Sequence, residues 1–164
     1  MTKEIVQIVK EEIKKAEGYP LLQKAIQIAF EAHEGQTDKG GNPYILHPLH
    51  VMNQLEMIDE KIVGVLHDTK EDAGLTDEFF RSEGFPERII QGIDSVTRRH
   101  DETYMGFIKR SSKDKLGHKV KKEDILHNMD SSRIPVITEE HVSLQKRYQK
   151  GLDFLNQAEG MKLE

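Results

Sequence analysis

Short motifs along this chain carry the residue types that hold a metal ion. Their candidate residues, in chain order, are His47 in YILHP, the group His67, Asp68, Glu71 and Asp72 in HDTKED, and Asp124 with Asn128 in EDILHN. Imidazole and carboxylate groups bind divalent metals. A metal ion that keeps an open position for water can catalyse hydrolysis. These residues therefore predict a hydrolytic metal centre, and hence an enzyme.

The HDTKED motif is expected near the end of one helix over residues 60–72. With about 100° per residue, its histidine and three acids share one helical face. Three acids this close repel each other unless a cation lies among them, and the end of a helix disfavours negative charge further. A metal ion would relieve both effects. The apolar residues before His67 indicate that it enters a core, but an exposed acidic helix end remains the alternative on these residues alone.

The two other motifs leave alternatives open. Asp124 and Asn128 are spaced i, i+4, so one could bind a metal while the other binds a substrate hydroxyl. A surface helix with a buried amide would explain the same pair. His47 precedes a proline, which favours extended geometry, and His50 lies three residues later. The residues alone do not decide which of these two histidines is the ligand.

The elements that must position these residues are all helical. No alternation typical of strands occurs, and Gly18 and Pro20 are expected to end the first helix. The stretch Arg98–Gly117 is polar and weakly patterned, and is the best candidate for a mobile loop. The expected helices span 3–16, 21–34, 48–57, 60–72, 76–82, 86–97, 103–111, 116–130 and 139–157, which predicts an all-α fold.

Composition excludes several classes of protein. The 164 residues are expected to form one domain. The absence of cysteine excludes thiolate sites, and 24 − 29 gives a net charge of −5, unlike a general nucleic-acid binder. We find no secretory signal and no span for a membrane, so a soluble cytoplasmic protein is expected. Seven Lys or Arg residues in Lys109–Lys122 could face a phosphorylated small molecule or simply form a solvated surface.

The order AHEGQ, GNPYILHP, HDTKED and VKKEDILHNMD resembles the HD-domain hydrolase of the RelA/SpoT-type alarmone synthetase/hydrolases, and more so their small stand-alone hydrolase relatives. The similarity covers about residues 21–135 of a single HD-type domain over 1–164. The resemblance implies an all-helical fold and one divalent ion, usually manganese. It implies metal ligands His47, His67, Asp68 and Asp124, water-activating residues Glu71 and Asp72, and substrate-binding residues Lys39, Tyr44 and Asn128.

Two positions depart from the pattern of that family. Asp38 stands where the family usually has an arginine that stacks on guanine, and Ile125 replaces a second arginine. His33 in AHEGQ is assigned to helix packing or to support of the site. The expected function is metal-dependent hydrolysis of a nucleotide, with guanosine 3′,5′-bis(diphosphate) favoured and pyrophosphate as a product. The alternatives are an HD phosphatase for another nucleotide or phosphorylated metabolite, and a nucleotide sensor without turnover.

Overall fold

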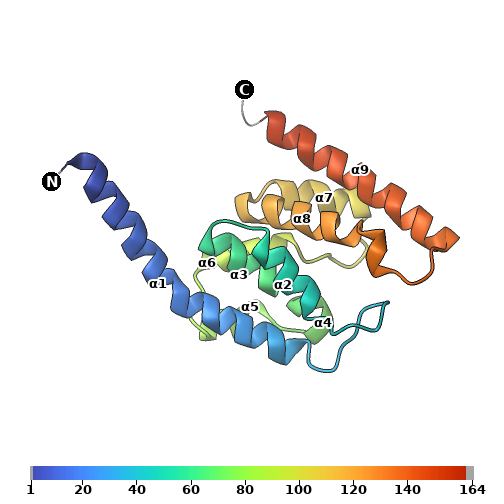
Figure 1. Ribbon diagram of the computed structural model, residues 1–164, viewed down its shortest axis with the longest axis horizontal. Helices are drawn as coiled ribbons and strands as arrows, with labels where there is room; N and C mark the ends of the chain where they lie inside the picture. The colour runs from blue at the N-terminus through green and yellow to red at the C-terminus, as the bar shows by residue number, and fades with distance from the viewer. Residues whose placement is uncertain (1, 162–164) are drawn as a thin grey trace.

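The computed structural model describes residues 2–161, and its regular elements are helices (Figure 1). Within these residues the only β pairing is an isolated antiparallel bridge between Thr37 and Pro43. The all-α prediction is confirmed. The α-helices are α1 (Lys3–Ala32), α2 (Leu46–Asn53), α3 (Ile58–Leu66), α4 (Thr69–Ala73), α5 (Asp77–Ser82), α6 (Glu87–Ser95), α7 (Tyr104–Ser112), α8 (Lys115–Asn128) and α9 (Glu139–Met161), with a 3-10 turn η1 (Ser131–Arg133).

Helix α3 lies at the centre and contacts α1, α2, α6 and α8. Its second half is apolar, as expected of a buried segment, and the side chains of Ile62, Val63, Val65 and Leu66 are inaccessible to solvent. A second apolar cluster joins α7, α8 and α9 around Ile108, Ile125 and Leu155. The two clusters meet along α8, so the EDILHN motif lies between them. Among residues 2–161, no helix combines the length and apolar character needed to cross a membrane.

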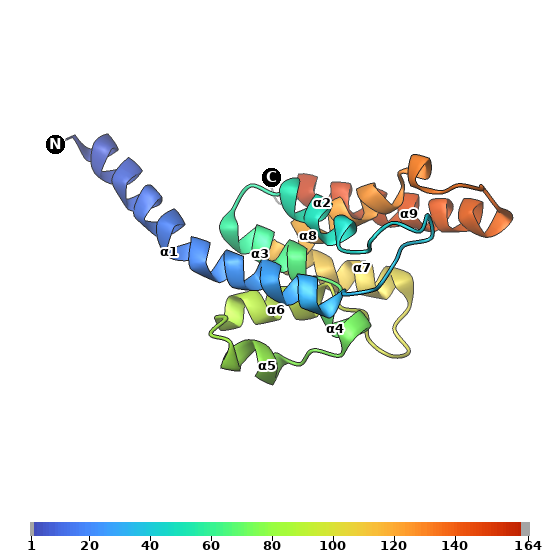
Figure 2. The same ribbon diagram turned by 60° about the horizontal axis from the view of Figure 1, so that its bottom comes forward.

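Helix α1 corrects the prediction of two helices separated by Gly18 and Pro20. It runs without a break through both residues, and its first half projects away from the other helices (Figure 2). Gly18 serves packing instead, because a Cβ there would lie 2.9 Å from Cγ2 of Ile58. Apolar side chains in residues 3–16 are left uncovered, with Ile8 and Ile13 each 54% exposed.

The predicted helix over 60–72 is also wrong, because it is interrupted at His67 and Asp68. Two carbonyl groups of its last turn are bonded by side chains. Thr69 donates its hydroxyl to the Leu66 carbonyl at 2.7 Å, and His67 Nδ1 lies 2.7 Å from the Gly64 carbonyl oxygen. Such side-chain bonds compete with the helical ladder, and a new short helix, α4, begins at Thr69.

The start of α2 is a further correction. His47 was expected to be extended before Pro48, but both residues lie in the first turn of α2, which begins at Leu46. A proline is tolerated there because the first backbone N–H groups of a helix lack partners in any case. The helical start fixes the direction of His47 toward α3 and α8.

The stretch Arg98–Gly117 is ordered rather than a loop, since α7 occupies its middle. Arg110 ties the stretch together: it bonds the Glu102 carboxylate at 2.7 Å and the carbonyls of Asp94 and Thr97 at 2.9 and 2.7 Å. The remaining predicted helices differ from the observed bounds by at most four residues at an end. Thr138 caps the start of α9, because its hydroxyl accepts the backbone N–H of His141 at 3.2 Å.

Candidate metal centre

The break between α3 and α4 brings two predicted ligands to one point. Because His67 ends α3 and Asp68 precedes α4, their side chains turn to the same side, and His67 Nε2 lies 3.0 Å from Asp68 Oδ2. Helix α2 supplies His47 and helix α8 supplies Asp124, whose Oδ1 lies 3.0 Å from His47 Nε2 and 3.5 Å from His67 Nε2. The structure thus brings together all four residues that the resemblance implied as ligands.

Both imidazole rings present Nε2 to the centre because their other nitrogen is engaged. The backbone carbonyl of Gly64 accepts a hydrogen bond from His67 Nδ1–H, which leaves the lone pair on Nε2. His47 Nδ1 lies 2.7 Å from Nδ1 of His127, on α8. Bonds of this kind to the outer nitrogen orient histidines that bind metals. His50 is outside this arrangement: it is exposed, and its ring stacks on His127 at 3.8 Å between centroids.

The separations of the donor atoms fit a divalent ion. First-row metals bind nitrogen and oxygen at about 2.0–2.2 Å, so neighbouring ligand atoms lie about 3 Å apart and opposite ones about 4 Å. The fourth measured separation, His47 Nε2 to Asp68 Oδ2, is 3.8 Å. Three of the residues, His47, His67 and Asp124, are buried and form a group able to hold a metal. Two neutral nitrogen and two carboxylate donors suit manganese or iron.

The charges of the site favour a cation at this point. Burial lowers the pKa of His67, but Asp68 and Asp124 overcome it and raise that pKa well above the usual value. Burial raises the pKa of Asp124, but Lys121 and His67 hold it well below the usual value. The pKa of Asp68 is lowered to about 2, chiefly by His67 against the effect of burial. Two ionised carboxylates in a buried site attract either a proton on His67 or a metal ion.

Three neighbouring side chains hold the carboxylates. Lys121 Nζ lies 2.8 Å from Asp124 Oδ2, and Asn128 donates its amide to Asp124 Oδ1 at 3.0 Å. The hydroxyl of Tyr44 donates to Asp68 Oδ2 at 2.5 Å. Asn128 and Tyr44, implied as substrate-binding residues, therefore contact the candidate ligands directly while also lining the adjacent pocket.

Glu71 and Asp72 lie in the first turn of α4 and point to different partners. Glu71 Oε1 accepts the backbone N–H of Arg98 at 2.6 Å. Partial burial raises the pKa of Glu71, and the charges of Asp68 and Asp72 add to the rise. Asp72 Oδ2 accepts the Gln36 amide at 3.1 Å. The expectation that both acids share a single helical face with His67 and Asp68 is not met, since the helix is interrupted.

A pocket of about 260 Å³ adjoins the centre, and it contains the third implied substrate residue, Lys39. His47 and Asn128 are among the residues that line it. The side chain of Asp38, on the same loop, is engaged in hydrogen bonds: its Oδ1 accepts the backbone N–H groups of Gly40 and Asn42, each at 2.9 Å. Its Oδ2 lies 3.8 Å from a guanidinium nitrogen of Arg133.

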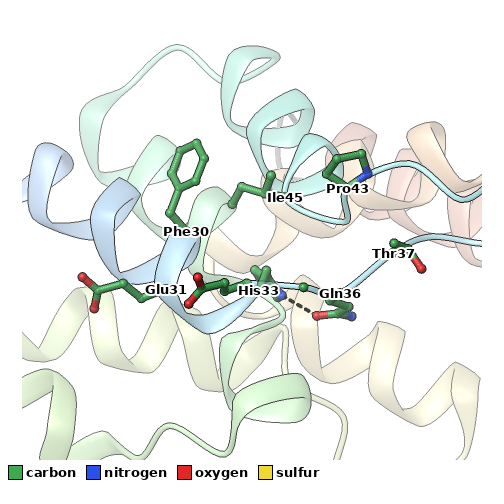
Figure 3. A pocket seen from close by; sticks show the side chains of 9 residues that line it. Phe30, Glu31, His33, Gln36, Thr37, Pro43 and Ile45 are labelled. Carbon is green, nitrogen blue, oxygen red and sulfur yellow. Dashed lines mark hydrogen bonds between the residues drawn. The ribbon is translucent and has the colours of Figure 1, made fainter.

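A larger, open cleft of about 440 Å³ lies on the other side of this loop, at the end of α1 (Figure 3). Buried His33 lies here, with Nδ1 2.8 Å from Oε1 of Gln36. The amide nitrogen of Gln36 donates to Asp72. His33 is thus linked to Asp72 through Gln36, and its support of the site stays a prediction.

Several residues of the site were not predicted from the sequence. Lys121 and His127 each lie three residues from Asp124 on one helix, so i, i+3 spacing could have identified them. Arg133 follows α8 in an irregular segment, where no periodic signal exists. Gln36 is the last residue of the AHEGQ motif, and the sequence did not indicate its hydrogen bond to Asp72.

Comparison with known proteins identifies relatives of this chain and the part of each that it matches. No protein-family model matches the sequence. The chain is 34% identical over 142 residues to a probable GTP pyrophosphokinase of Mycobacterium leprae, which covers 79% of this chain and 18% of that protein. It is 43% identical over 82 residues to a guanosine-3′,5′-bis(diphosphate) 3′-pyrophosphohydrolase of Borreliella burgdorferi, and 41% identical over 81 residues to one of Aquifex aeolicus. These two matches cover 48% and 47% of this chain, and 12% of each relative. The chain therefore spans less than a fifth of the length of these relatives. One of them is named as a pyrophosphokinase and two as pyrophosphohydrolases.

Proposed function

Because the chain resembles the HD hydrolase domain of RelA/SpoT-type enzymes, we propose that it is a metal-dependent phosphohydrolase of nucleotides. The favoured substrate is guanosine 3′,5′-bis(diphosphate), hydrolysed at the 3′ position to release pyrophosphate. The observation that carries this proposal is the convergence of His47, His67, Asp68 and Asp124, beside a pocket that contains a lysine. A centre for hydrolysis needs both a site for the ion and room for a phosphorylated ligand.

Manganese is the ion we assign to His47, His67, Asp68 and Asp124. When bound, it would lower the pKa of a coordinated water and polarise a phosphoryl oxygen. The chain provides the geometry for this: Lys121 and Asn128 fix Asp124, Tyr44 fixes Asp68, and His127 fixes His47. Rigid support of the ligands keeps the site arranged before the substrate arrives.

We assign the transfer of protons to Glu71 and Asp72. The raised pKa of Glu71 brings its carboxylate closer to neutral pH, where a general base works best. In the reaction, the oxygen of a water bonds to the phosphorus next to the 3′ oxygen, and the bond from that phosphorus to the 3′ oxygen breaks. One proton of the water passes to the carboxylate and from there to the 3′ oxygen, which leaves as a hydroxyl. Lys39 would neutralise phosphate charge.

A second candidate is hydrolysis of a different nucleotide or phosphorylated metabolite. Asp38 favours it, because a carboxylate bonded within its own loop offers no stacking surface to guanine. The third candidate is a nucleotide sensor without turnover. The raised pKa of Glu71 argues against a sensor, because binding alone does not require a carboxyl group with a raised pKa.

A turnover assay distinguishes the three. Protein loaded with manganese is incubated with guanosine and adenosine 3′,5′-bis(diphosphates), nucleoside triphosphates and sugar phosphates, and phosphate and pyrophosphate are quantified. Release of pyrophosphate from the guanosine compound supports the leading proposal. Turnover of another compound alone supports the second candidate. Tight binding without turnover of any compound would favour the sensor.

A further inference from the structure

Arg133 lines this pocket, and neither the metal centre nor the proposed catalysis assigns it a role. It lies after α8, in the turn η1, and its side chain is 24% exposed. It lines the same pocket as Lys39 and His47, so a ligand that reaches the metal centre through this pocket passes along it.

The guanidinium of Arg133 is held in place along its edges. One terminal nitrogen donates to the His127 carbonyl at 3.0 Å, and the other lies 3.8 Å from Asp38 Oδ2. Because these two contacts use the N–H edge of a planar group, they fix the orientation of its plane.

The loop that carries Asp38 is built to approach this arginine closely. A Cβ at Gly40 would lie 2.9 Å from the backbone oxygen of Arg133, so a larger residue would push the two segments apart. Asp38 Oδ1 bonds the backbone of its own loop, which leaves Oδ2 for Arg133. Burial alone would raise the pKa of Asp38, but these backbone bonds and Arg133 lower it, so Asp38 is ionised at neutral pH.

A guanidinium balanced in this way is poorly suited to hold a phosphate. Its charge is offset by Asp38, and its N–H edge is engaged with protein oxygens. The flat faces of the guanidinium donate no hydrogen bonds. Ile134, Leu144 and Tyr148 line the same pocket with apolar or aromatic surface. Lys39 also lines the pocket, and no salt bridge joins it to a carboxylate of the lining residues. The phosphates of a ligand are therefore better placed near Lys39 and the metal centre than near Arg133.

We propose that Arg133 is a specificity-determining residue whose guanidinium face stacks on the purine base of the nucleotide, with Asp38 as the residue that positions it. The inference rests on the proposed function, because it takes the ligand to be a nucleotide. The pocket of about 260 Å³ is smaller than the about 300–1,000 Å³ of typical sites for whole small molecules, in keeping with a site for one part of the ligand.

The test is a set of binding measurements by calorimetry, with guanosine and adenosine 5′-diphosphates and with pyrophosphate as the ligand that lacks a base. Stacking of an arginine on an aromatic face is worth about 0.5–2 kcal/mol, which corresponds to about a 2- to 30-fold change in Kd. Arg133→Ala should weaken binding of both nucleoside diphosphates by this factor and leave binding of pyrophosphate unchanged. Arg133→Lys should behave like the alanine variant, because lysine keeps the charge but lacks the plane.

The matched control is Arg88→Ala, since Arg88 also pairs with an aspartate, Asp59 at 2.7 Å, but does not line the pocket. Asp38→Asn should give a smaller loss than Arg133→Ala, because it keeps the loop bonds and removes only the charge. Thermal unfolding of each variant identifies any loss of fold. Native affinity in Arg133→Lys alone would show that charge, not stacking, is used, and would overturn the proposal. Unchanged nucleotide affinity in both Arg133 variants would also overturn it while the proposed function stands. If the native protein binds no nucleotide, the proposed function itself fails.

Discussion

The Nδ1 atoms of His47 and His127 lie 2.7 Å apart, and the two rings are parallel within 3°. One nitrogen must donate and the other accept. Burial, with further contributions from Arg133, His47 and His50, lowers the pKa of His127 to about 4, so its ring is neutral at pH 7. A neutral His127 can accept a hydrogen bond from His47 Nδ1–H, which leaves His47 Nε2 with a lone pair directed at the metal centre.

This relationship predicts an order of effects on metal affinity. His47→Ala should abolish manganese binding, because it removes a ligand. His127→Phe keeps a ring of similar size but removes the acceptor, and should weaken binding by about 10- to 100-fold. His50→Ala is the control, because His50 contacts only the outer side of this pair. Titration against a chelating dye measures all three. Equal losses in the His50 and His47 variants would refute the assignment of His47 as a ligand.

Glu71→Gln separates catalysis from binding. Its amide oxygen can still accept the backbone N–H of Arg98, so the fold of α4 should persist. Without an ionisable group the rate should fall by about 10²–10⁴, the usual effect of losing a general acid or base. Metal content, measured by elemental analysis, should not change. Loss of the metal would identify Glu71 as a ligand, whereas full activity would remove it from the mechanism.

Glu102 should make stability depend on pH in the acid range. The hydrogen bond with Arg110 lowers the pKa of Glu102 from 4.5 to about 2 in the folded protein. A lowered pKa stabilises the folded state above pH 4.5, and this contribution disappears as the pH falls toward 2. At pH 6 the Glu102→Gln variant should be less stable by about 1–2 kcal/mol. Urea unfolding of both proteins between pH 6 and pH 2 measures the difference, which should shrink steadily on acidification. A difference that stays constant with pH would show that the ion pair is not its cause.

Gly117 should be the least replaceable glycine of the helices. A Cβ there would lie 1.9 Å from Ser95 Oγ and 3.1 Å from the Ser111 carbonyl oxygen, where α8 crosses α6 and α7. Gly117→Ala should therefore cost about 1–3 kcal/mol of stability. Gly160, in α9, has no such neighbour within 4 Å, so Gly160→Ala should stabilise by about 0.5–1 kcal/mol. Thermal unfolding compares the two. An unaffected Gly117→Ala variant would mean that the helices do not pack this closely.

Much of the fold was accessible from local signals in the sequence. Apolar periodicity identified most helices, because each of them buries one face. The continuity of α1 was not accessible, because it depends on Gly18 meeting Ile58, a contact between residues far apart in the chain. Proline and glycine usually interrupt helices, and here tertiary packing outweighs that tendency.

The candidate site was predictable in its residues but not in its geometry. The types and order of the ligand residues indicated a metal centre, and the structure places them together. The break after Leu66 was hidden, because it depends on how Thr69 and His67 bond the preceding carbonyls. The pairing of Asp38 with Arg133 was hidden as well, since it joins two irregular segments for which the sequence carries no periodic pattern.

The central claim is that these four ligand residues form a metal centre that hydrolyses a nucleotide at a phosphorus atom. The most direct test is hydrolysis of guanosine 3′,5′-bis(diphosphate) in water labelled with oxygen-18, with metal-free protein and with protein reconstituted with manganese. We predict guanosine 5′-diphosphate and pyrophosphate with one labelled oxygen on the pyrophosphate, only in the presence of metal and not with His67→Ala. Hydrolysis by metal-free protein or by His67→Ala at the rate of the manganese-reconstituted protein would contradict it, as would no hydrolysis of this or any other nucleotide by protein that holds manganese.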